Sequence, residues 1–139
     1  MKGRPTKELT ISILIIMIGL YFVLQKPKEG KIEISTFGEQ RFFVAETKEF
    51  EGLTMTFNEI KDDSRCPIDV QCVQAGSVVV NITLKSGFKE ETINHDSDGT
   101  PLEFKDFEIS IIQVFPELES LLSFNQNDYA VIFNVEPIS

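Results

Sequence analysis

Residues 77–84 read SVVVNITL, and apolar side chains fill every second position from Val78 to Leu84. Successive side chains of an extended strand point to opposite faces, so one face of this segment is apolar while the other carries Asn81 and Thr83. A period of two predicts a half-buried strand of an antiparallel sheet, not a helix. The fold class depends on how often this pattern recurs.

The same alternation recurs in three further segments that are bounded by turn residues. Their apolar positions are Leu53, Met55 and Phe57, then Phe107, Ile109 and Ile111, and finally Tyr129, Val131, Phe133 and Val135. Weaker strands are expected at residues 41–46, 88–93 and 102–104. About seven strands in roughly 100 residues predict an all-β domain, either an antiparallel β-sandwich or a small barrel.

Ile60 lies out of phase with the apolar positions that precede it. Because one extra residue shifts the alternation of a strand, we expect a β-bulge near Asn58 and Glu59. Such a bulge would direct the residues that follow it away from the sheet.

An uncharged apolar run, LTISILIIMIGLYFVL, occupies residues 9–24. Its 16 residues would span about 24 Å as a helix, and the flanking Lys7 and Lys26 can reach the interfaces of a hydrocarbon core of roughly 30 Å. The run therefore predicts one N-terminal transmembrane helix that serves as an uncleaved anchor. A signal peptide is the alternative, because basic residues precede the run, although no small-x-small cleavage site follows it.

These features divide the 139 residues into four predicted parts. They are a basic N-terminal tail (1–8), the transmembrane anchor (9–24), a polar tether (25–36) and a β-domain (37–139). Lysines and arginines number three on each side of the anchor, so they do not decide its orientation. Two cysteines close in sequence, and no others, favour an oxidising compartment for the β-domain. We therefore expect a single-pass protein of the cell membrane, with its N-terminus cytoplasmic and its β-domain outside.

The part of the chain that follows the anchor is strongly acidic. Residues 31–139 carry 8 basic and 20 acidic side chains, a net charge of −12, against −9 for the whole chain. A domain of this charge repels phosphates, which excludes nucleic acid as a partner. An apolar content of 42% with 12 phenylalanines is enough for a packed core.

Both cysteines lie in residues 62–76, DDSRCPIDVQCVQAG. Five residues separate Cys66 from Cys72, unlike the Cys-x-x-Cys of redox centres, and no second cysteine or histidine pair completes a zinc site. The spacing favours a structural disulfide that closes a loop. Reduced thiols in a cytosolic domain, and a copper or other metal site, are the alternatives.

We expect this loop to contact a partner. The candidate contact residues are Asp63, Ser64, Arg65, Asp69, Gln71 and Gln74. Arg65 stands between two acids and can pair bidentately with either Asp63 or Asp69. It would then either brace the loop or meet an anionic partner.

The loop sequence resembles that of an uncharacterised family of short exported prokaryotic β-rich proteins. The shared motif is Asp-Ser-Arg-Cys-Pro at residues 63–67, then Cys72, then Ala75 and Gly76 before a strand. The resemblance extends from about residue 38 to residue 135, and members of that family often carry tryptophan where this chain has Gln74. It implies an exported β-rich domain and no particular activity.

Few residues suggest catalysis or modification. His95 is the only histidine and lies in the predicted turn NHDSDGT (94–100). A Ser-His-Asp triad or a histidine-rich zinc site is therefore poorly supported, because either would depend on this one residue. The same turn matches half of a calcium loop, but Phe107 stands where the distal glutamate is required. Asn81 begins an N-glycosylation sequon on the predicted outward face of its strand.

The leading hypothesis is a non-enzymatic, membrane-anchored extracytoplasmic β-domain that binds an envelope protein or polymer through the disulfide-closed loop, without a cofactor or metal. One alternative is an envelope enzyme or metal-handling protein whose site at the acidic loops uses Asp62, Asp63, Asp69 and His95. A second alternative is an accessory subunit of a surface appendage or an S-layer anchor.

Overall fold

The computed structural model describes residues 7–24 and 32–139, with helix side chains described at 11–21 only. The chain divides into two compact units, residues 1–30 and 31–139. The first unit contains helix α1 (Lys7–Leu24), which covers the predicted apolar run. Among the described residues, no helix is both long and apolar enough to cross a membrane. The membrane anchor at 9–24 stays a prediction.

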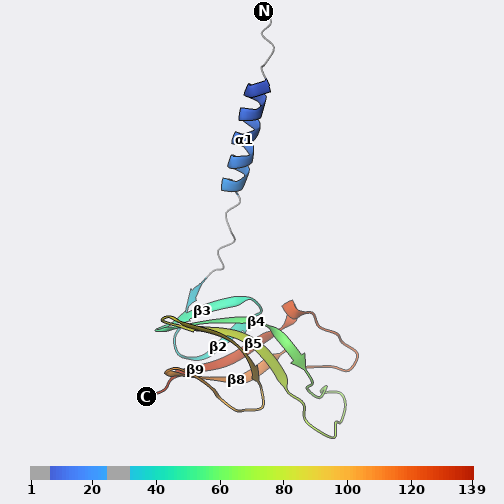
Figure 1. The fold of residues 1–139 in the computed structure, drawn as a ribbon. Helices are drawn as coiled ribbons and strands as arrows, with labels where there is room; N and C mark the ends of the chain where they lie inside the picture. Colours follow the sequence, from blue (N-terminus) through green and yellow to red (C-terminus); the bar gives the residue numbers. More distant parts are fainter. Residues whose placement is uncertain (1–6, 25–31) are drawn as a thin grey trace, which may run out of the picture. The chain divides into compact units, whose positions relative to one another are not determined.

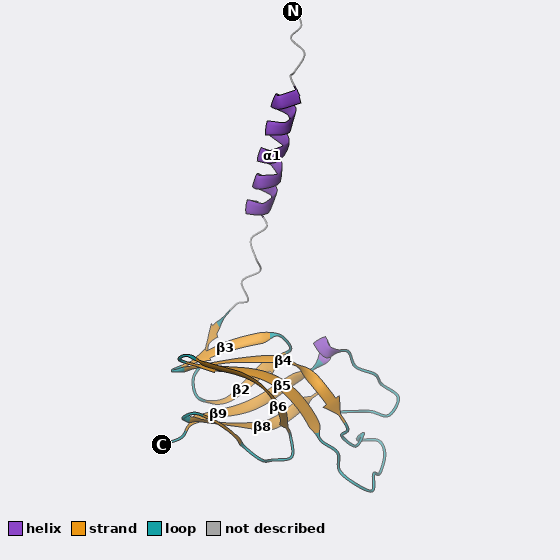
Figure 2. Ribbon diagram, viewed as in Figure 1, coloured by secondary structure: helices purple, strands orange, loops and turns teal. Residues whose placement is uncertain are grey.

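The second unit is mostly β, and its described residues form two sheets of five and four strands (Figures 1 and 2). The first sheet has the order β1 (Glu33–Ile34), β3 (Glu46–Phe50), β4 (Leu53–Asp63), β5 (Val78–Ser86) and β6 (Lys89–Asp96). The second has the order β2 (Gly38–Phe43), β9 (Ala130–Pro137), β8 (Phe107–Phe115) and β7 (Leu102–Phe104). A 3-10 helix, η1 (Gln126–Asp128), precedes β9.

A single apolar core is built from both sheets. Alternate residues of β5 are buried, as are those of β4 before its bulge and those of β9, which confirms the period of two in these strands. The rings of Phe57 from the first sheet and Phe133 from the second meet edge to face, with centroids 6.0 Å apart. Phe42 of β2 contacts Phe133 in the same way at 5.4 Å. The Phe57–Phe133 contact joins the two sheets, whereas Phe42 and Phe133 belong to neighbouring strands of the second sheet.

The bulge expected near Asn58 and Glu59 is present. The pairing of β4 with β5 shifts register between Phe57 and Glu59, and again between Ile60 and Asp62. Strand β8 has a similar irregularity between Ile111 and Gln113. The two strands that carry irregularities are therefore those that lead into the loops 64–77 and 116–125.

The alternation pattern does not reveal β1 or β3. The segment 41–46 is not one strand, because Ala45 has a φ of 65° and turns the chain from β2 in one sheet to β3 in the other. Strand β3 places Lys48 at a buried position. The Lys48 Nζ lies 3.6 Å from a carboxylate oxygen of Glu33 and 3.8 Å from one of Glu46. A charged residue on the buried face conceals the period of two.

Strand β1 lies within the predicted tether (25–36) and pairs in parallel with β3. The sheet therefore begins at residue 33, before the expected boundary at residue 37. The remainder of the tether up to residue 31, and most of the predicted basic tail (1–8), lie outside the described residues.

Candidate functional site

Cys66 and Cys72 form the predicted disulfide, with their sulfur atoms 2.11 Å apart and their Cα atoms 5.9 Å apart. Neither is left as a free thiol or as a metal ligand. The bridge lies in the connection between β4 and β5, residues 64–77, which we call the cysteine loop. Gln71 and Gln74 are exposed on this loop, as a contact role requires.

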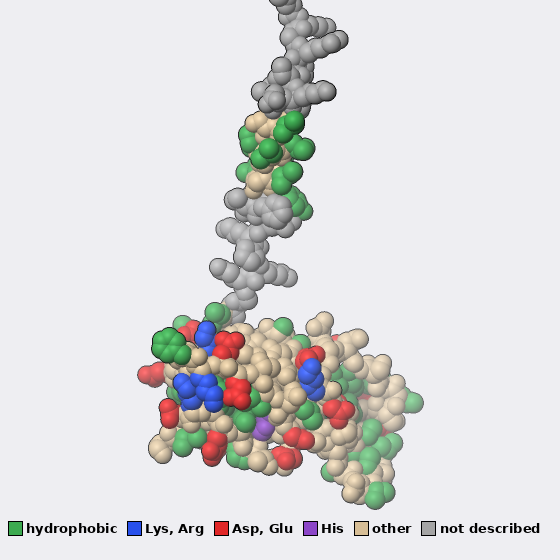
Figure 3. Space-filling model, in the orientation of Figure 1, with side chains coloured by type: hydrophobic (Ala, Val, Ile, Leu, Met, Phe, Trp, Pro, Cys, Tyr) green, Lys and Arg blue, Asp and Glu red, His purple; other side chains and the backbone are tan. Residues whose placement is uncertain are grey.

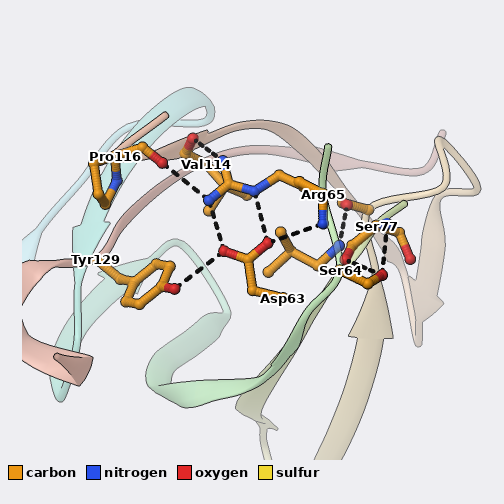
Figure 4. A network of polar contacts seen from close by, with 9 residues as sticks. Asp63, Ser64, Arg65, Ser77, Val114, Pro116 and Tyr129 are labelled. Carbon is orange, nitrogen blue, oxygen red and sulfur yellow. Dashed lines mark hydrogen bonds and ion pairs between the residues drawn. The ribbon is translucent and has the colours of Figure 1, made fainter. Parts of the chain in front are cut away.

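The two ends of the cysteine loop meet at Ser64 and Ser77 (Figure 4). The backbone N–H of Ser64 donates to the Ser77 carbonyl at 2.9 Å, and the Ser64 hydroxyl accepts from the Ser77 N–H at 3.1 Å. A Cβ atom on Gly76 would lie 1.6 Å from the Ser64 carbonyl oxygen. Gly76 is therefore required by the close approach of two backbones. Ser64, predicted as a contact residue, closes the neck of the loop.

Arg65 is held by four side-chain hydrogen bonds (Figure 4). Its Nε and Nη2 donate to the two carboxylate oxygens of Asp63 at 2.9 and 2.7 Å. Its Nη1 donates to the Val114 carbonyl and its Nη2 to the Pro116 carbonyl, both at 2.9 Å. Four of the five guanidinium N–H groups thus have partners within the chain. We call this arrangement the Asp63–Arg65 clamp.

The clamp also sets the protonation of the groups around it. Burial raises the pKa of Asp63, but the hydrogen bonds and positive charge of Arg65 outweigh it and hold that pKa below its usual value. The Tyr129 hydroxyl donates to Asp63 at 3.1 Å, and burial together with this carboxylate raises the pKa of Tyr129. At neutral pH the carboxylate is therefore charged and the phenol is a neutral donor.

Arg65 is expected either to brace the loop or to meet an anionic partner, and its contacts favour the bracing role. The Arg65 side chain is only 20% exposed and that of Asp63 8%, so an anionic partner would have to displace a largely buried carboxylate. The other acid, Asp69, does not reach Arg65. It accepts hydrogen bonds from the backbone N–H of Ser120, at 2.8 Å, and from the Ser120 hydroxyl. The bond from the Ser120 side chain is the main reason that the pKa of Asp69 is lowered.

These contacts tie the cysteine loop to residues 116–125, which we call the second loop. Arg65 donates to the Pro116 carbonyl and Asp69 accepts from Ser120. In addition, Ile68 donates its N–H to the Leu118 carbonyl at 2.8 Å. At the far end of the second loop, the Gln126 side chain both accepts from and donates to the backbone of Ile60, each at 2.8 Å. The two loops are therefore fixed to each other and to β4.

The tied loops expose several large apolar side chains. Val73 and Leu121 are almost fully exposed, at 104% and 94%. The exposed apolar residues of the two loops, which we call the apolar loop surface, are Ile68, Val70, Val73, Leu121 and Leu122. Figure 3 shows apolar side chains gathered on this projecting part of the domain. None of them is among the predicted contact residues, all of which are polar or charged.

Charges near the apolar loop surface are mostly acidic. Exposed acids on the two loops and at the end of β4 are Asp62, Asp69, Glu117 and Glu119. The two cations of the cysteine loop and the end of β4, Lys61 and Arg65, are ion-paired with Glu59 and Asp63. Arg41 of β2 lies over the ring of Phe115, next to the second loop. The surface thus combines apolar side chains with negative charge that no described basic residue of these loops neutralises.

The alternative site built from Asp62, Asp63, Asp69 and His95 does not assemble. Asp63 is in the clamp and Asp69 binds Ser120, whereas His95 lies within β6 rather than in a turn. No group of three or more possible ligands that could hold a metal occurs in the described part of the chain. His95 is buried, and desolvation lowers its pKa against the opposing charges of Asp98 and Asp96.

Asn81 lies on β5, between two neighbouring strands. Its Nδ2 donates to the Asn94 side chain at 2.7 Å, and its Oδ1 accepts from Asn58 at 2.8 Å. A glycan would be attached to that same Nδ2, where it would replace one of the two N–H groups. Glycosylation of Asn81 stays a prediction.

No protein-family model matches this chain, and neither the curated proteins nor the solved structures contain a match. The coarser expectation, a small β-rich protein with one disulfide, is confirmed. Membership of the family that the Asp-Ser-Arg-Cys-Pro motif resembles stays a prediction.

Proposed function

We propose that this protein is a non-enzymatic, membrane-anchored β-domain of the cell envelope that binds a partner through its two tied loops. The observation that carries the proposal is that these loops are internally braced and yet expose five large apolar side chains. In a protein of this size such residues are normally placed in the core. Clusters of them at the surface mark sites of interaction.

Bracing makes the loops suitable for recognition. A loop that must be ordered on binding loses conformational entropy, and this loss weakens the complex. Here the disulfide, the Asp63–Arg65 clamp and the Asp69–Ser120 contact hold the loops before any partner arrives. The exposed side chains are therefore presented in one arrangement.

The compartment is supported by different observations. A disulfide persists in an oxidising environment, which supports a β-domain outside the cytoplasm. The resemblance to exported proteins points the same way. The membrane part of the proposal rests on the apolar sequence at 9–24. The cytoplasmic N-terminus follows from that anchor together with the oxidising compartment that the disulfide supports.

Site-directed photo-crosslinking in intact cells tests the proposal on the full-length chain. A photo-reactive phenylalanine analogue would replace Val73 or Leu121 in separate variants. Phe88, which is fully exposed at the turn between β5 and β6, provides the matched control position. We expect positions 73 and 121 to give the same crosslinked product and position 88 not to give it.

Two outcomes would contradict the proposal. One is the same set of crosslinked products from all three positions, which would indicate non-specific encounters and not recognition at the two loops. The other is no crosslink from position 73 or 121 in cells where the protein is folded and disulfide-bonded. Protease digestion of intact cells tests the orientation separately, because the β-domain should be degraded only if it lies outside.

A further inference from the structure

Resting on the proposed function, we infer that the partner is a protein whose contact surface presents apolar side chains surrounded by lysine or arginine. Two properties of the loops lead to this chemistry. The centre of the surface is aliphatic and its charged residues are acidic.

The aliphatic side chains determine the centre of the interface. Val73 and Leu121 project from loops that lie side by side, because Ile68 bonds to Leu118 and Ser120 to Asp69. Burying such side chains against apolar groups of a partner removes apolar surface from water and so stabilises a complex. A partner with aliphatic or aromatic anchors therefore fits this surface better than a polar polymer does.

The charges determine the rim. Glu117 and Glu119 are exposed on the second loop, and Asp62 is exposed at the end of β4. The cations of these loops and of the end of β4 are already paired, since Arg65 is held by Asp63 and Lys61 by Glu59. Arg41 of β2 lies over the Phe115 ring, 4.8 Å from its centroid, and belongs to neither loop. Residues 31–139 have a net charge of −12, so the field of the whole domain also attracts cations. An acidic partner or an anionic polymer would be repelled, whereas basic groups at the rim would be attracted.

Defined peptides test this chemistry without knowledge of the natural partner. The probes are an amphipathic Leu/Lys peptide, a Leu/Glu peptide with the same apolar face, and the neutral oligosaccharide maltohexaose. Each peptide carries one tryptophan, because the protein has none and the peptide emission is therefore free of background. Binding to the full-length chain is measured in an uncharged detergent at constant concentration.

Three forms of the full-length chain are compared. They are the wild type, the double variant Val73→Ser/Leu121→Ser, and the control Phe88→Ser. Both variants remove exposed apolar groups without changing charge, so detergent effects cancel in the comparison. Melting temperatures of all three are measured first, and we expect them to agree because all three positions are exposed.

We expect the Leu/Lys peptide to bind the wild type and Phe88→Ser equally, and the double variant at least about tenfold more weakly. The Leu/Glu peptide should bind the wild type at least about tenfold more weakly than the Leu/Lys peptide. Raising the salt concentration from about 0.05 to about 0.5 M should weaken binding of the Leu/Lys peptide.

Three outcomes would overturn the inference. They are equal binding of the two peptides, binding of maltohexaose in their place, and no probe that binds the wild type more tightly than the Val73→Ser/Leu121→Ser variant. The proposed function would remain open to the crosslinking test, because crosslinks at positions 73 and 121 do not depend on the charge of the partner. Conversely, peptide binding without crosslinks in cells would contradict the proposed function.

Discussion

Two regions of the domain are ordered by different interactions. One is the core that the two sheets enclose, and the other is the pair of tied loops. In the core, side chains such as Ile82 and Phe133 are fully buried, and stability comes from the removal of apolar surface from water. In the loops, the apolar loop surface faces the solvent, and order comes from hydrogen bonds, one disulfide and the packing of Phe124 against the core. The comparison shows that one small domain can contain an apolar interior and a separately braced apolar exterior.

The largest expected effect comes from placing a charge in the core. Ile82→Asp should lower the free energy of unfolding by more than about 4 kcal/mol, because it buries an unpaired carboxylate in a central strand. Thr83→Asp, on the opposite face of the same strand, should cost about 1 kcal/mol or less. Urea unfolding measures both. Similar losses would mean that both faces of β5 are buried.

The next largest effect comes from breaking the Asp63–Arg65 clamp. Arg65→Ala should cost about 2–4 kcal/mol, because it leaves a largely buried carboxylate and the Val114 and Pro116 carbonyls without their donor. The control Lys61→Ala removes an exposed ion pair and should cost below about 0.5 kcal/mol. Urea unfolding again gives both values. If Arg65→Ala keeps the stability but abolishes the crosslink from position 73, Arg65 contacts the partner directly.

Removing the disulfide should have a smaller effect. Cys66→Ser/Cys72→Ser should cost about 2 kcal/mol on the loop-entropy model, because the bridge joins residues only six positions apart. The domain should stay folded, since the core does not include the cysteine loop. Thermal unfolding measures the loss. Thiol counting on the unfolded, unreduced wild type should find no free thiol, and two would refute the pairing.

The smallest expected effect is on the pH dependence of stability. The folded-state pKa of His95 is lowered by burial, so the unfolded chain binds the proton more readily. The stability that neutral His95 provides is complete above about pH 6.5 and decreases as the pH falls toward the folded-state pKa. The lowered pKa of Asp63 affects stability only as the pH falls through the ordinary aspartate value of 3.8, so the two effects are separable.

Melting temperatures at about pH 7.5 and 5.5 test the role of His95. The wild type should lose stability over this range, by about 1 kcal/mol or less. His95→Leu, which places an apolar side chain at the same buried position, should lose less. An equal loss in the two proteins would assign the pH dependence to other groups.

The core was accessible to prediction because it follows a local rule. Period-two alternation identified β4, β5, β8 and β9, and the single out-of-phase residue, Ile60, located the bulge in β4. It missed β3 because Lys48 occupies a buried position that is compensated by Glu33 and Glu46. Such compensation depends on β1, which lies in a segment with the composition of a tether.

The braced loops were accessible only in part. Two cysteines in a short polar segment were enough to predict the disulfide. The choice of Arg65 between Asp63 and Asp69 was not predictable, because it depends on carbonyls 49 and 51 residues away and on Ser120. The exposed Val73 and Leu121 were missed because an apolar residue in a sequence carries no sign of whether it will be buried.

Strand β1 has a mechanical consequence for this domain. Any pulling force on the chain before residue 32 reaches the sheets first through the pairing of Glu33 and Ile34 with β3. Among the described residues, this attachment consists of two residue pairs of the parallel ladder, the bond from the Ser35 N–H to the Glu49 carbonyl, and the Glu33–Lys48 ion pair. Under load β1 should therefore peel off before any core strand moves. Each released residue lengthens the connection by about 3.5 Å and leaves the two tied loops undisturbed.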